Sequence, residues 1–153
     1  MDERTCFFIG HREASRELFP ALETSIQRHI VQYGVETFVV GGYGGFDRLV
    51  SEVLIAAKQR HPHICLLRLI PYHPVERSVE PPKGFDGTFY PPDMEYVPRR
   101  VAIIKANHYM VDHAKYLIAY VWHSDGNARA LVEYAQKRQV RGLIRVENLA
   151  DNK

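Results

Sequence analysis

Five short apolar runs recur along the 153-residue chain and indicate its fold. They are "TCFFIG" (5–10), "ETFVVGG" (36–42), "HICLLRLI" (63–70), "KYLIAYVW" (115–122) and "GLIRV" (142–146). Most of the runs are continuous rather than alternating, which is typical of strands that are covered on both faces in a parallel sheet. We therefore predict five strands at these positions.

The segments between the runs carry apolar residues at helical spacing. The repeating positions are Leu18, Leu22, Ile26 and Ile30; then Leu49, Val53 and Ala57; then Ile103, Ala106 and Met110; and finally Leu131, Tyr134 and Ala135. Because strand and helix alternate from end to end, we predict an α/β fold: a doubly wound, Rossmann-like three-layer sandwich with a mostly parallel five-stranded sheet. The length predicts one domain, residues 1–153.

One segment, residues 71–98, breaks this alternation. It holds seven of the nine prolines together with several aromatic residues. A connection this long without secondary structure is usually a binding loop or a disordered insert, and its aromatic content favours an ordered loop. Two interpretations stay open, a loop that covers a ligand and a structural cover over a sheet edge.

Composition and charge narrow the possible functions. The 20 basic and 18 acidic residues nearly balance, which argues against a dedicated nucleic-acid-binding protein. The start of the chain lacks a secretory pattern, and no apolar run approaches the ~20 residues that span a bilayer. Cys6 and Cys65 lie in strand-like runs, which favours buried structural thiols over a disulfide or a reactive site. We expect a cytoplasmic protein that does not associate with membranes.

Three connections that follow predicted strands carry unusual chemistry. They are "GHRE" (10–13), "GGYGGFD" (41–47) and "HSDGNAR" (123–129). In an open parallel sheet, ligands bind beyond the carboxyl ends of the strands. If the three connections share one crevice, their backbone N–H groups, helix N-termini and arginine suit an anion such as the phosphate of a nucleotide.

Each motif alone has a simpler explanation. "GGYGG" fits neither G-x-G-x-x-G nor G-x-x-x-x-G-K-[ST], which disfavours a nicotinamide dehydrogenase or a P-loop NTPase. A tight strand-to-helix turn explains the glycines equally well, and helix capping explains Asp47 and Asn127. For Arg12, a functional role is favoured over a structural one. This residue follows an apolar strand beside Gly10, where a phosphate or carboxylate would be held.

The eight histidines do not indicate a metal site. His108 and His113 are five residues apart, the wrong spacing for one helix face, and no set has the spacing of zinc ligands. No G-x-S-x-G or Cys–His pattern supports a covalent nucleophile. We therefore expect no metal and no cofactor, and the sequence identifies no catalytic residue.

Four segments taken together resemble a known superfamily. In chain order they are "CFFIGHR", "VVGGYGGFDRLV", "FYPPDMEYVPRRVAIIKANHYMVDHAKYLIAYV" and "SDGNARALVEYAQKR". They resemble the blocks of the SLOG superfamily, the Rossmann-like proteins related to DNA-processing protein A and to the Lonely Guy cytokinin-activating enzymes. The best match is the small, single-domain, bacterial YpsA-like branch. The resemblance covers residues 5 to 146.

This resemblance implies a nucleotide or nucleotide-derived ligand, bound by the glycine-rich loops of a protein that acts as a sensor. The candidate ligand-binding residues that it implies are Gly10, His11, Arg12, Gly42, Gly44, Gly45, Asp47, Asn107, Gly126 and Asn127. Asn107 and Asp112 both lie in "KANHYMVDHA", and packing or capping remains an alternative for each. Related proteins often self-associate, so the expected assembly is a homodimer.

The chain departs from the enzymatic members at one turn. The Lonely Guy signature "PGGxGTxxE" corresponds here to "SDGNARAL", with Leu131 near the glutamate position. Glu133 follows two residues later, about 200° around the helix. Binding with weak catalysis or none is therefore the leading interpretation.

Two alternatives remain. One is a phosphoribohydrolase or nucleosidase-like enzyme acting on nucleoside monophosphates, with Glu13 or Asp47 as the substitute carboxylate. The other is single-stranded DNA binding, which would need a basic groove with exposed aromatic residues; the near-neutral charge speaks against it.

Overall fold

The computed structural model describes residues 3–73, 75 and 80–152. Within them, six strands form one sheet in the order β4-β3-β2-β1-β5-β6, and every pairing is parallel. The strands are β1 (Thr5–Gly10), β2 (Thr37–Val40), β3 (Cys65–Leu69), β4 (Gly87–Phe89), β5 (Tyr116–Tyr120) and β6 (Arg145–Asn148). The predicted α/β fold with a parallel sheet is confirmed, with six strands instead of five.

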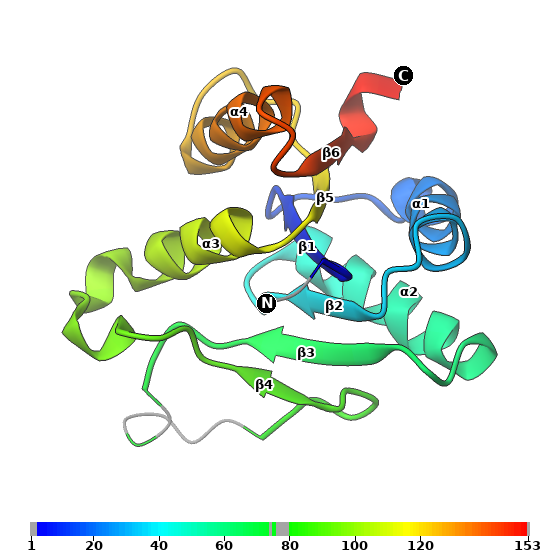
Figure 1. Cartoon of the computed structure of the whole chain (residues 1–153), viewed down its shortest axis with the longest axis horizontal. Coiled ribbons are helices and arrows are strands. Elements are labelled where there is room, and N and C mark those ends of the chain that lie inside the picture. The colour runs from blue at the N-terminus through cyan, green and yellow to red at the C-terminus, as the bar shows by residue number, and fades with distance from the viewer. Residues whose placement is uncertain (1–2, 74, 76–79, 153) are drawn as a thin grey trace.

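Four helices cover the two faces of this sheet: α1 (Phe19–Val31), α2 (Gly45–Arg60), α3 (Ala102–His113) and α4 (Asn127–Val140). Helices α1 and α2 lie on one side of the strands, and α3 and α4 lie on the other (Figure 1). Short 3-10 helices span Arg16–Leu18, Met94–Tyr96, Arg99–Val101 and Leu149–Asn152. Among the described residues, no helix is long and apolar enough to cross a membrane.

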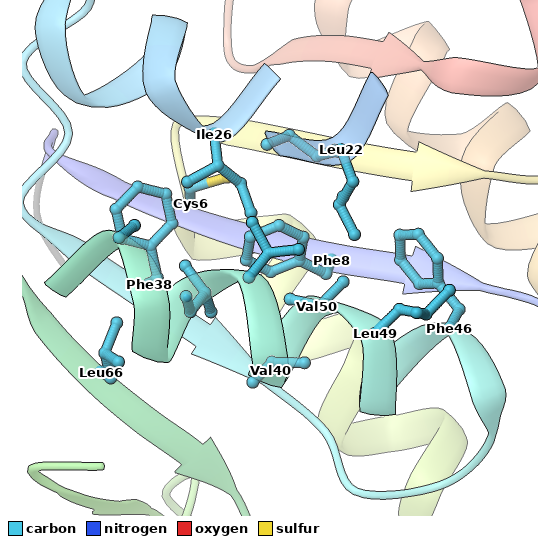
Figure 2. Close-up of a cluster of buried hydrophobic side chains, with 14 of the residues drawn as sticks. Cys6, Phe8, Leu22, Ile26, Phe38, Val40, Phe46, Leu49, Val50 and Leu66 are labelled. Atoms are coloured by element: carbon cyan, nitrogen blue, oxygen red, sulfur yellow. The ribbon is translucent and has the colours of Figure 1, made fainter. Parts of the chain in front are cut away.

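The continuous apolar runs are explained by two cores, one on each face of the sheet. Along β1, Phe8 packs with the α1 and α2 side, and Phe7 and Ile9 pack with the α3 and α4 side. Figure 2 shows Leu22 of α1 and Val50 of α2 meeting over Phe8. Since successive side chains point to opposite faces, a strand buried on both must be apolar at nearly every position.

The strand missed by the sequence prediction, β4, lies inside the proline-rich segment 71–98. It pairs with β3 over three residues, with Leu67 opposite Gly87 and Leu69 opposite Phe89. Asp86 anchors its start, because its carboxylate accepts the N–H of Leu66 at 2.7 Å. Part of this segment therefore extends the sheet edge, while residues 74 and 76–79 lie outside the described residues.

The last strand also differs from its prediction. It begins at Arg145, three residues later than the start of the run 142–146, because Gly142 takes a φ of +76° in the turn that follows α4. Both cysteines are free thiols. Cys6 is buried, as predicted, and Cys65 is only partly buried.

The strand order places one crevice between diverging connections. The chain runs outward from β1 to β4 and then returns, through α3, to β5 on the other side of β1. The connections after β1 and β5 therefore leave toward opposite faces of the sheet. In open α/β sheets, this switch point, at the carboxyl ends of the strands, is where ligands bind.

Candidate functional site

A cavity of about 350 Å³ opens at the carboxyl edge of the sheet. It lies between the amino-terminal halves of α3 and α4 and the segments that follow β1, β2 and β3. Ile103 and Ile104 of α3 and Leu131 of α4 give it apolar walls. Its volume is at the lower end of the range for small-molecule sites, about 300–1,000 Å³.

The structure brings half of the predicted site residues to this cavity. The residues that line it are Gly10, Arg12, Asp47, Asn107 and Asn127. The predicted residues that do not line it are His11, Gly42, Gly44, Gly45 and Gly126. The three segments after β1, β2 and β5 do converge, although they do not all contribute the residues that the motifs suggested.

The glycine turn before α2 packs closely against the segment after β1. The N–H of Gly45 donates to the carbonyl oxygen of Arg12 at 2.7 Å, and the N–H of Phe46 donates to that of His11 at 3.3 Å. A Cβ on Gly45 would lie 2.4 Å from the Arg12 oxygen. These glycines therefore allow one stretch of backbone to approach another. Their predicted role in ligand contact stays a prediction.

Gly10 has a similar packing requirement at the end of β1. A Cβ there would lie 2.3 Å from the ring of Phe46, which is buried at the start of α2. Gly42 leaves room for Arg68, whose Nη1 would be 2.5 Å from a Cβ at that position. The buried ring of Phe46 thus requires a glycine at position 10, whereas the end of the flexible Arg68 side chain can shift and does not by itself require one at position 42.

His11 joins the end of β1 to the segment that follows β5. Its Nε2 accepts the backbone N–H groups of Trp122 at 3.0 Å and His123 at 3.2 Å. Because burial disfavours the charged ring, and the nearby His123 adds to this effect, the pKa of His11 lies below its usual value. The ring is buried away from the cavity, and its contacts give it a structural role.

Arg12 stands in contrast to His11. Its side chain is exposed at the rim of the cavity, and its guanidinium has no hydrogen bond or ion pair with any described residue. A planar cation with five N–H donors is suited to hold a phosphate or carboxylate.

The start of α4 offers further donors at the same cavity. Its N-cap, Gly126, has φ +97° and ψ 174° and can supply no capping side chain. The N–H groups of Asn127 and Ala128, both of which line the cavity, have no acceptor among the residues that the structure describes. Open N–H groups at a helix N-terminus favour an anion.

Asp47, in the first turn of α2, adds a carboxylate to the cavity lining. Burial raises its pKa from 3.8 to about 6, against the smaller opposing effects of the Tyr43 N–H and the Arg68 charge. The N–H of Tyr43 donates to Oδ2 at 3.1 Å. A carboxyl group that titrates near neutral pH can give or take a proton in a reaction.

A cluster that the sequence prediction missed lies across α3 and α4. His108 and Tyr134 both line the cavity, and their rings are 4.3 Å apart. Behind them, the Tyr134 hydroxyl donates to Oδ1 of Asp112 at 2.5 Å, and Nδ1 of His108 is 3.5 Å from Oδ2. The packing alternative for Asp112 is therefore supported. The i, i+4 spacing of His108 and Asp112 was the sequence signal for this pair.

Metal ligation has no structural basis in the described part of the chain, where no group of three or more His, Cys, Asp or Glu residues could hold an ion. The cavity combines the backbone N–H groups at the start of α4, the guanidinium of Arg12 and the carboxyl group of Asp47.

Fold and cavity together define a Rossmann-like α/β protein with a binding cavity at the carboxyl edge of its sheet. Comparison with known proteins finds no matching family model and no matching curated protein. The assignment to the SLOG superfamily therefore rests on the sequence motifs and is part of the proposal below.

Proposed function

We propose that the protein binds a nucleotide or nucleotide-derived ligand in this cavity and acts as a sensor of the SLOG type. The observation that carries the proposal is the meeting of a free guanidinium, Arg12, with the open N–H groups of Asn127 and Ala128 at one apolar cavity. Such donors suit a phosphate, and the isoleucine-lined walls suit a base or another flat ring.

Two further polar residues fit the sugar of the same ligand. Asp47 and Asn107 line the cavity and carry oxygen acceptors for hydroxyl groups. The expected setting is the cytoplasm, where the two free thiols stay reduced. A homodimer is the expected assembly, as in related proteins.

The first experiment is a thermal-shift and calorimetric screen against the nucleoside monophosphates and diphosphates of adenine, guanine, cytosine and uracil. A ligand at one hundred times its Kd adds about 2.7 kcal/mol of stability. Arg12→Ala should abolish this shift. Arg141→Ala is the matched control, because Arg141 is exposed and does not line the cavity. Equal affinity of wild type and Arg12→Ala would refute this placement of the site.

Hydrolysis of an N-glycosidic bond is the second candidate function, and the raised pKa of Asp47 favours it. Water would add to the sugar carbon as the C–N bond breaks, with one proton passing to the departing base. Asp47 and His108 are the cavity residues that can move this proton. Chromatography of incubated ligand distinguishes the candidates: released base supports an enzyme, and Asp47→Asn should then stop the release.

A further inference from the structure

A second hollow shares Arg12 with the cavity. This groove, called here the Trp122 groove, is lined by Arg12, Glu13, Ala14, Ser15, Tyr120 and Trp122. It lies between the segment that follows β1 and the end of β5, the two strands that flank the switch point. Arg12 lines both hollows, so one guanidinium stands at the boundary between them.

Trp122 forms an open aromatic surface in this groove. Its side chain is 53% exposed, although a large aromatic residue usually buries most of its surface. The ring is nevertheless held in place from one side: it stacks on His123 at 3.8 Å, and the edge of the His11 ring approaches it at 5.3 Å. The backbone is fixed as well, because its N–H donates to Nε2 of His11.

A supported aromatic ring with an open side is a stacking site for a nucleobase, because every base has a π-face. The other residues of the groove fit this use. Ser15 and Glu13 offer oxygen atoms to sugar hydroxyls or to an amino group on the base. The Glu13 carboxylate also disfavours phosphate within the groove, which directs the anionic part of a ligand to Arg12.

The cavity alone is too small for more than about one nucleotide. Its 350 Å³ lies at the lower end of the range for small-molecule sites. A longer ligand that keeps its phosphates at Arg12 must extend out of the cavity, and the Trp122 groove is the neighbouring hollow that Arg12 also lines. Dinucleotides in Rossmann-like folds bind across the crevice at the switch point.

We propose that the ligand is of the dinucleotide class, with two ring-bearing halves joined through a diphosphate. One half occupies the cavity, the diphosphate lies at Arg12 and the start of α4, and the second base stacks on Trp122. This inference rests on the proposed nucleotide-binding function and adds to it the class of the ligand and a second subsite.

The proposal is tested by calorimetry with AMP, ADP and diadenosine diphosphate, a series that adds first a phosphate and then a second nucleoside. The corresponding guanosine compounds are measured in parallel. The dinucleotide should bind at least tenfold more tightly than the diphosphate. Trp122 is the single tryptophan of the chain, so its fluorescence reports stacking directly. The dinucleotide should quench this fluorescence, whereas the mononucleotides should not.

Trp122→Ala should raise the Kd of the dinucleotide about tenfold and leave that of AMP unchanged. Unchanged AMP binding shows that the variant is folded. Trp122→Phe should restore part of the lost affinity. Tyr96→Ala is the matched control, because Tyr96 is 81% exposed and lines neither hollow; it should change no Kd.

Three results would overturn the inference, and only the third also overturns the proposed function. If mononucleotides bind but the dinucleotide gains nothing, or if Trp122→Ala keeps the gain, the second subsite is wrong and the proposed function stands. If none of the nucleotides binds, the proposed function is wrong and this inference is wrong with it.

Discussion

The starts of α2 and α4 share one backbone conformation and differ in what surrounds it. Both helices begin after a glycine in an extended conformation with positive φ: Gly44 at φ +122° and ψ 177°, and Gly126 at φ +97° and ψ 174°. At α2, a Cβ on Gly44 would lie 3.0 Å from Cα of Arg12. At α4, a Cβ on Gly126 would meet nothing within 4 Å.

The backbone donors follow the same division. The N–H groups of Gly45 and Phe46 at the start of α2 are bonded to carbonyl groups after β1, whereas those of Asn127 and Ala128 at the start of α4 have no acceptor among the described residues. A glycine turn before a helix therefore has two distinct uses. One joins two segments of the protein, and the other leaves donors open at a cavity.

The largest expected effect is that of Gly44→Ala. Alanine at this position is strained by the positive φ and also meets the backbone of Arg12, so two costs combine. We expect a loss of about 3 kcal/mol or more in the free energy of unfolding, measured by urea denaturation.

Gly87→Ala in β4 is the control for Gly44→Ala, since a Cβ there makes an ordinary contact of 3.4 Å with Leu67. An equal loss at both positions would contradict the packing argument.

The next effect is that of Gly126→Ala. The same conformational strain applies, but open space surrounds the new methyl group. We expect a loss of about 1–2 kcal/mol from strain alone. The difference between the two glycine variants then measures the packing against Arg12. If Gly126→Ala were as damaging as Gly44→Ala, the start of α4 would be packed and not open. Asn127→Ala, one residue later, should change stability by less than about 0.5 kcal/mol.

The smallest effect is the pH dependence introduced by Asp47 at the start of α2. Between pH 3.8 and about 6, the folded protein keeps a proton that the unfolded chain has lost. The stabilising contribution is complete below pH 3.8 and is lost as the pH rises through 6. Asn at this position never ionises and keeps an oxygen acceptor for the N–H of Tyr43.

Asp47→Asn should therefore gain stability relative to wild type as the pH rises from 4 to 8. Since Asp47 keeps partial contact with solvent, we expect a change on the order of 1 kcal/mol. Urea denaturation of both proteins at pH 4.5, 5.5, 6.5 and 7.5 measures it. A difference in stability that is constant over this range would mean that Asp47 titrates at its ordinary pKa.

Most of the fold could be predicted because strands that are buried on both faces of the sheet appear in the sequence as continuous apolar runs. The strands β1, β2, β3 and β5 lie inside their predicted runs. β4 could not be found in the same way, since its three residues are only partly buried and stand among prolines. Its pairing depends on contacts with β3, among them the bond from the N–H of Leu66 to Asp86, which joins residues 20 positions apart in the sequence.

The candidate site was predicted in part for a similar reason. Arg12, Asp47 and Asn127 follow strands, and the carboxyl ends of parallel strands meet at one edge. His108 and Tyr134 were missed because their place at the cavity depends on how α3 and α4 face each other. His11 was predicted as a ligand contact, but its ring nitrogen accepts two N–H groups of the segment after β5, a contact that no local pattern reveals.

A polar link joins α3 and α4 beside the part of the cavity wall that Tyr134 forms. Asp112 accepts the hydroxyl of Tyr134, and Arg138 donates to the Asp112 carbonyl at 3.1 Å. Asp112 and Arg138 do not line the cavity, whereas Tyr134 both lines it and takes part in the link. Tyr134 is thus shared between the cavity wall and the bond that joins the two helices, so its replacement would alter both at once.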